Sequence, residues 1–414
     1  MDQRGGRGVI IITTFCSSFI ALSWLGAGSA QAATEVELLR RALSMPTLQA
    51  ELAAVEARGE AQGSGPALLA NPELTARHEQ EGGGASTTDA LGGALSFDLG
   101  LSTLAERQAA DLRGRAAPSR SRAAVLDAIC TVRGAALDQW QSQEQLRALE
   151  EALARLERLE RDMGRLAEAG ESSGYDRDRV ALARLTLAVE RDRMRVEAAH
   201  AAAALAGWTG EPVPQLSLAP SSGAAGRGEP ASDPTLAALR LERDAAQRSL
   251  AASRRSTLPD LVIEGGARWD TPANGGAGNP GFELGGALEL PLFDWNRAGR
   301  SDAQASLREA EAALLRREAE LRARVEAARL SVEQLGAAPT GLDAEAVWTG
   351  AVARYVQGEA SIDELLEAAQ DVAEASAAMA VGEALRRRAA LDLSCALGSF
   401  PEPEIHSLYE ELAR

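Results

Sequence analysis

Four short segments of the chain alternate apolar and polar residues, which is the period-two pattern of a β-strand with one solvent-exposed face. They lie at about 71–79, 91–101, 259–270 and 281–292. Strands of about ten residues with this alternation suit a tilted transmembrane β-strand, although a soluble sheet with one exposed face has the same pattern. The apolar positions that define one face are Leu95, Phe97, Leu99, Leu101, Leu261, Ile263, Ala267, Trp269, Phe282, Leu284, Leu288, Leu290 and Leu292.

Long segments with apolar residues spaced three and four apart follow each pair of strands and predict helices. These helices are expected at about 103–169, 175–206, 298–357 and 360–397, and a shorter one from Glu35 to about Gly59. At 1.5 Å per residue the first would reach roughly 100 Å, far beyond one globular domain. Such helices are expected to pack in an extended assembly, and Pro118 is expected to kink or interrupt the first of them.

The strand and helix patterns occur twice in the same order, about 190 residues apart, which indicates two structural repeats. The first repeat is expected over 33–215 and the second over 231–414, joined by a Pro/Gly-rich linker at 216–230. Each consists of a helix, a β-hairpin, a long helix and a returning helix. The predicted fold is therefore mainly α-helical with a smaller, transmembrane β portion.

Four strands cannot close a barrel, and lipid does not tolerate an open strand edge. If the hairpins enter a membrane, copies of the chain must associate, giving eight strands in a dimer or twelve in a trimer. The competing hypothesis is a periplasmic helical scaffold or adaptor-like protein whose hairpins stay in water.

Composition narrows the class of protein. Aromatic residues are only 4% of the chain, so the helices are expected to pack through small residues. A formal net charge of -17 argues against nucleic acid as a partner, because phosphate binding needs clustered positive charge. The histidines His78, His200 and His406 lie in separate segments, so no metal site is predicted, and no pattern indicates a cofactor or an enzyme.

The first 32 residues have a basic start, an apolar run and a small-residue end, which predict a secretory signal peptide at 1–32. Export would place Cys130 and Cys395 in an oxidising compartment, where a disulfide is permitted. The interpretation favoured from sequence is that they are two separate small buried residues on helices.

Six stretches together resemble the TolC-like outer-membrane efflux protein family. They are "LPDLVIEGG" and "LELPLFDWNRAGRSDAQA" around the second hairpin, a helix break "AAPTGLDAEAV" around Pro339, "ARYVQGEASIDELLEAAQDVAEA", and the repeat ends "ALAGWTGEPVP" and "SCALGSFPEPE". The resemblance implies a homotrimer whose twelve strands form one barrel in the outer membrane, continued by a periplasmic α-helical tunnel. It also implies a passive exit duct that works with a periplasmic adaptor and an inner-membrane efflux pump. The first hairpin departs from the family in having Asp98 where a Gln-Pro-like pair often precedes the helix.

The resemblance further implies a periplasmic entrance at the turns marked by Gly170 and Gly358. There, Glu364 and Glu367 are expected to contribute to an acidic ring, and Tyr355 and Asp176 to links that restrain it. An ordinary solvated acidic face is the alternative for the two glutamates. The family's Arg at this turn is replaced by Ala360, so the Asp176 link is either absent or supplied by Arg177 or Arg179.

Overall fold

The computed structural model describes residues 33–67, 71–80, 86–170, 173–218, 233–272, 277–290, 295–336 and 343–412. The predicted signal peptide at 1–32 and the predicted helix break around Pro339 lie outside these ranges. The helices are α1 (Glu35–Leu43), α2 (Pro46–Gly63), α3 (Ser102–Glu168), α4 (Gly174–Thr209), α5 (Pro234–Arg255), α6 (Arg297–Leu335), α7 (Ala344–Val356), α8 (Ile362–Leu397) and α9 (Pro403–Leu412). The strands are β1 (Ala33–Thr34), β2 (Glu73–Gln80), β3 (Ser86–Asp98), β4 (Leu216–Ser217), β5 (Asp260–Pro272) and β6 (Asn279–Glu289).

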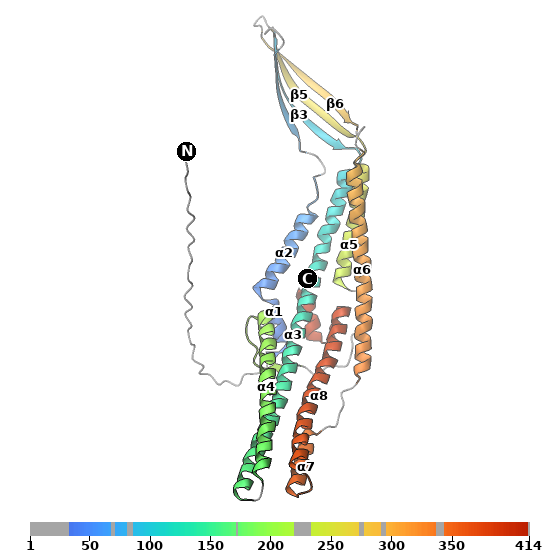
Figure 1. Cartoon of the computed structure of the whole chain (residues 1–414). Coiled ribbons are helices and arrows are strands. Elements are labelled where there is room, and N and C mark those ends of the chain that lie inside the picture. Colours follow the sequence, from blue (N-terminus) through green and yellow to red (C-terminus); the bar gives the residue numbers. More distant parts are fainter. Residues whose placement is uncertain are drawn as a thin grey trace, which may run out of the picture.

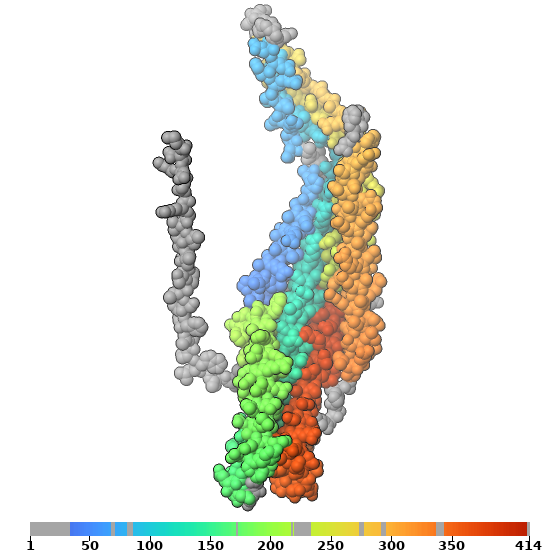
Figure 2. All heavy atoms as spheres, in the orientation of Figure 1, coloured from blue at the N-terminus to red at the C-terminus, as the bar shows by residue number. Residues whose placement is uncertain are grey.

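The molecule is elongated, with one sheet at one end and long helices running away from it (Figure 1 and Figure 2). β2, β3, β5 and β6 form a single antiparallel sheet in that order, so the two hairpins lie side by side through β3 and β5. The turns from α3 to α4 and from α7 to α8 lie together at the opposite end, which we call the tip. α1, α9 and the short β1–β4 pair gather midway, at what we call the waist.

α3 is the spine of the molecule and contacts α2, α4, α5 and α8 along its 67 residues. It continues through Pro118, so the expected interruption there is wrong. The packing against α2 is close because small residues face each other. A Cβ atom added to Gly114 would lie 2.9 Å from the Cα atom of Gly63, which leaves no room for a side chain at this crossing.

The residue just before the long helix that follows each hairpin is left-handed: Leu101 before α3 has φ 54°, and Asn296 before α6 has φ 47°. In the first repeat the Asp98 carboxylate holds this junction, since it accepts hydrogen bonds from Ser102 Oγ (2.7 Å) and Thr103 N (2.7 Å). A carboxylate that satisfies the first helical N–H groups is a good helix start. Asp98 therefore has a structural task at the position where the chain departs from the family pattern.

Several predicted boundaries differ from the structure. β3 begins at Ser86, five residues earlier than expected, and the first helix is broken before Pro46, where α2 begins. The helix expected over 298–357 is two helices, because α6 ends at Leu335 and Gly336 adopts φ 55°. The linker starts later than residue 216, because Leu216 and Ser217 pair with Ala33 and Thr34.

The favoured interpretation of the cysteines is also wrong. Cys130 of α3 and Cys395 of α8 form a disulfide, with Cα atoms 6.0 Å apart and 265 residues between them in sequence. Helical periodicity placed each cysteine on a helix, but only the packing of α8 against α3 brings them together. Within the described residues, no helix combines the length and the hydropathy that crossing a bilayer requires.

Candidate functional site

The sheet has one continuous apolar face that no other part of the described chain covers. Pairing places Leu74 opposite Gly93, Gly93 opposite Gly265 and Gly265 opposite Leu284, so one row crosses all four strands. The side chains at the two ends of this row are 83% and 86% exposed, which is far from the burial of core leucines. The other exposed apolar residues on this face are Leu91, Leu95, Ile263, Trp269, Phe282 and Leu288.

The apolar face has a polar limit near the hairpin turns. There His78 lies opposite Asp89, and the His78 Nδ1 atom is 2.6 Å from the Asp89 Oδ1 atom. Asp89 in turn pairs with Trp269, whose side chain is 45% exposed. Tryptophan beside polar groups at the end of an apolar surface is the arrangement found at a membrane–water interface.

The opposite face of the sheet is acidic. Arg268 forms ion pairs with Asp270 (3.0 Å) and Glu283 (3.8 Å), and Arg77 pairs with Glu79 (3.2 Å). These two arginines are outnumbered by the carboxylates that share their face, which are Glu73, Glu79, Asp98, Asp260, Glu264, Asp270, Glu283 and Glu289. Between these side chains lies an open hollow of about 630 Å³ whose floor is backbone glycine.

At the tip, the two repeats use the same local design. Gly170 and Gly358 have φ angles of +75° and +73°, a conformation that glycine adopts without steric cost, and each ends a helix. A serine then caps the next helix: Asp176 N donates to Ser173 Oγ (3.2 Å), and Glu364 N donates to Ser361 Oγ (3.3 Å). Asp176 and Glu364 thus occupy equivalent positions in the first turns of α4 and α8, where negative charge favours the helix.

The two predicted entrance glutamates are exposed, but they do not line the same surface. Glu367 lines a shallow groove of about 540 Å³ between α4 and α8, together with Arg179, Asp363, Leu366 and Gln370. Glu364 is not among the residues that line it. Because Glu364 and Glu367 are three residues apart, both carboxylates lie on one side of α8. Within a single chain, however, only Glu367 faces the α3–α4 hairpin.

Tyr355 links α7 to α3 within the chain, because its hydroxyl donates a hydrogen bond to Met163 Sδ at 3.4 Å. Burial raises the pKa of the Tyr355 phenol, and the negative charge of Asp176 raises it further. The hydroxyl therefore stays protonated throughout the physiological range. Among the described residues, no ion pair involves the Asp176 carboxylate, so it acts on Tyr355 by its field alone.

The contact between α4 and α8 at the tip is an ion pair of Arg179 with Asp363. Arg179 also donates from Nη1 to the Tyr175 hydroxyl (3.2 Å), and its guanidinium lies 5.8 Å from the centroid of that ring. Arg177 pairs with the adjacent Asp178 instead. Sequence reasoning proposed Arg179 as a substitute link but missed Asp363. The sequence feature that could have revealed Asp363 is its position in the first turn of a capped helix that follows Gly358.

The family comparison concerns the second half of the chain. Residues 230–399 match the model of the outer membrane efflux protein family. Over this segment the chain is similar to that family. It covers α5, the second hairpin, and α6 to α8, including Glu364, Glu367 and Tyr355. None of the curated proteins matches the chain in sequence.

Solved structures extend the likeness to nearly the whole chain. The Campylobacter jejuni CmeC outer membrane channel superposes with a TM-score of 0.69 at 16% identity, covering 95% of this chain and 94% of that one. A membrane protein from Pseudomonas aeruginosa has a TM-score of 0.68 at 21% identity, covering 94% and 97%. The open state of the Neisseria gonorrhoeae MtrE outer membrane channel gives 0.65 at 19%, covering 88% and 89%. At such identities the matches establish the fold alone, and they extend it through both halves of the chain.

The described residues contain no group of three or more His, Cys, Asp or Glu side chains that could hold a metal ion. The candidate site consists of an apolar surface of the sheet, an acidic surface behind it, and a charged tip at the far end of the helices.

Proposed function

We propose that this protein is the outer-membrane channel of a tripartite efflux system, a passive exit duct for substrates. The observation that carries the proposal is the two-faced sheet, with exposed leucine and phenylalanine on one side and carboxylates on the other. β5 has 13 residues, so it measures about 43 Å along the strand and about 30 Å across a bilayer at a 45° tilt. Lipid would cover the apolar face, and the acidic face would line the pore.

The sheet requires partners because β2 and β6 each have one unpaired edge in the chain. Lipid supplies no hydrogen bonds to such an edge, so β6 of one copy would pair with β2 of the next until the ring closes. Three copies give twelve strands, enough to leave a channel, whereas eight strands are filled by their own side chains.

The helices below the sheet have open edges too. Leu185, Val189 and Val196 of α4 are each more than half exposed and are spaced four and seven residues apart, so they lie on one side of the helix. At the other edge, Val356 of α7 is 77% exposed. α3 and α8 separate these two edges in the chain, so the α4 edge of one copy faces the α7 edge of the next in a ring. Copies that close the barrel would thereby also close a helical tunnel.

The tip would be the periplasmic entrance, where an adaptor and an inner-membrane pump deliver substrate. Glu364 and Glu367, repeated in three copies, would place exposed negative charge there and favour cations. Tyr355, with the Arg179–Asp363 pair, would restrain the α7–α8 hairpin against α3 and α4, whereas the Asp176 carboxylate would act only through its charge on the Tyr355 phenol. Opening would then be a shift of one hairpin against the other that adaptor binding favours.

The test is to isolate outer membranes, extract the mature protein in mild detergent, and measure its mass by light scattering corrected for bound detergent. A trimer from that fraction which conducts ions after reconstitution in planar bilayers is the expected result. A water-soluble periplasmic monomer would refute the channel and favour the helical scaffold, since its hairpins would never enter lipid.

A further inference from the structure

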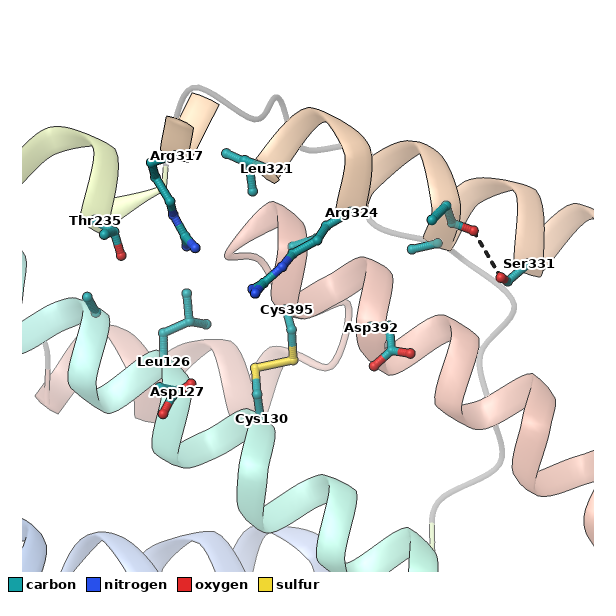
Figure 3. A pocket seen from close by; sticks show the side chains of 14 residues that line it. Leu126, Asp127, Cys130, Thr235, Arg317, Leu321, Arg324, Ser331, Asp392 and Cys395 are labelled. Carbon is teal, nitrogen blue, oxygen red and sulfur yellow. Dashed lines mark hydrogen bonds between the residues drawn. A yellow bond between two sulfur atoms is a disulfide. The ribbon is translucent and has the colours of Figure 1, made fainter. Parts of the chain in front are cut away.

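The Cys130–Cys395 disulfide lies at the waist, near the end of α8 that is remote from the tip. Figure 3 shows the two sulfur atoms bridging α3 and α8 at the floor of a cavity of about 760 Å³. Cys395 is two residues from the end of α8, and Gly398 caps that helix in a left-handed conformation. The bond therefore attaches the last turn of α8 to the middle of the spine helix.

Further interactions fix the same region. One turn beyond Cys130, Arg133 is 10% exposed and pairs with Glu35 of α1 (2.5 Å) and with Glu402 just before α9 (3.0 Å). Its guanidinium also lies 5.5 Å from the centroid of the Phe400 ring. On the tip side of the disulfide, Arg388 pairs with Asp138 of α3. The waist end of α8 is thus joined to α3 by a covalent bond and an ion pair, and Arg133 joins α3 to α1 and to the segment that follows α8.

The tip end of α8 has no covalent attachment among the described residues. Ile362, Leu365 and Leu366 pack into a core with α3, α4 and α7, and the link to α4 is the solvent-exposed Arg179–Asp363 pair. An exposed pair contributes little, and packed leucines can separate locally without breaking bonds. α8 is therefore restrained unequally at its two ends.

We propose that the disulfide makes the waist end of α8 a fixed pivot, so that the α7–α8 hairpin moves only at the tip. The gating role of this pivot rests on the proposed function, whereas the anchoring of α8 does not. Because Cys130 and Cys395 come from different repeats, the bond also ties the first half of each chain to the second. Displacement at the entrance would then leave the waist, and the helices that lead to the sheet, in place.

The test is amide hydrogen exchange, read by mass spectrometry, in the full-length trimer in detergent. Leu365→Ala loosens the tip core, because Leu365 is 1% exposed. With the disulfide intact, exchange over 362–373 should rise at least about tenfold, while exchange over 389–397 stays within about twofold of wild type. In a Cys130→Ser/Cys395→Ser background, the same Leu365→Ala change should accelerate both segments.

Two results would overturn the pivot. One is faster exchange over 389–397 in Leu365→Ala with the disulfide intact. This measurement does not require that any cysteine variant folds. The other is unchanged protection of 389–397 when Leu365→Ala is made without the disulfide, which would assign the anchoring to the Arg388–Asp138 pair and the packing of α8 on α3. Failure of the channel itself would appear separately, as absent conductance in a trimer whose exchange still follows the predicted pattern.

Discussion

The strongest prediction compares two adjacent residues of β2 that face opposite sides of the sheet. Leu74 lies on the apolar face, in the row that ends at Leu284, the middle residue of β6. Thr75 follows it and faces the acidic side, opposite Gly92. Leu74→Arg would therefore put a guanidinium into the middle of the bilayer, whereas Thr75→Arg would put it into the pore beside carboxylates.

The expected magnitudes differ widely. An arginine on the lipid face of a barrel near the midplane costs about 2–4 kcal/mol. Three copies raise the cost of Leu74→Arg to roughly 6–12 kcal/mol per trimer, which is comparable with the whole stability of many domains. Thr75→Arg should change the free energy of unfolding by about 0.5 kcal/mol or less per chain, as an exposed polar substitution does. In a sheet surrounded by water, both substitutions would be near neutral, since the Leu74 side chain is already 83% exposed.

The assay is urea unfolding of protein refolded into phospholipid vesicles, followed by the trimer fraction on mild gels and by tryptophan fluorescence. Leu74→Arg should lower the unfolding midpoint strongly or abolish the trimer, and Thr75→Arg should unfold like wild type. Midpoints that agree for the two variants would refute the assignment of the apolar face to lipid. The same comparison for Leu284→Arg would then decide whether the error is confined to β2 or extends across the sheet.

Three further predictions concern the helical part. Glu364→Gln with Glu367→Gln should lower the cation selectivity of the reconstituted channel, measured as a reversal-potential shift toward zero in a salt gradient, because exposed negative charge is removed at the entrance. Arg133→Met should destabilise the protein by about 3 kcal/mol in thermal or denaturant unfolding, since two carboxylates lose a buried partner. Because the pKa of Tyr355 is raised in the folded protein, the protonated phenol contributes stability below the ordinary pKa of 10.0, and this contribution is lost as the pH rises through the raised pKa. Alkaline unfolding of Tyr355→Phe should therefore lack this loss of stability.

Matched controls separate these effects from nonspecific ones. Glu374→Gln removes an exposed charge further along α8, outside the groove, and should leave the reversal potential closer to wild type. Arg147→Met breaks a pair whose arginine is 62% exposed, so it should cost at most about 1 kcal/mol. Equal selectivity in the glutamate variants and in Glu374→Gln would contradict an acidic ring. Equal destabilisation by the two arginine variants would contradict a stabilising role of the buried Arg133 ion pairs at the waist.

The local conformations followed from the sequence because they depend on neighbours along the chain. Alternation placed Leu95, Ile263 and Leu288 on one face, and the register confirms that they share it. The face of the sheet on which a strand residue lies depends only on whether its position along the strand is odd or even. This can be read from the sequence without knowing the partner strand. In the same way Gly170 and Gly358 marked places where the chain needs a left-handed residue.

Tertiary packing decided the features that join segments distant in sequence. Periodicity put Cys130 and Cys395 on helices but carried no information about the rotation of α8 on α3, which is what brings the two Cα atoms to 6.0 Å. The Arg179–Asp363 pair and the ion pairs of Arg133 with Glu35 and Glu402 likewise depend on how helices meet. The sequence by itself determined the strands and the helices, because hydrophobic period and turn residues act locally. Which side chains meet across the molecule was decided only by the fold, because helix rotation and axial offset arise from the sum of all packing contacts.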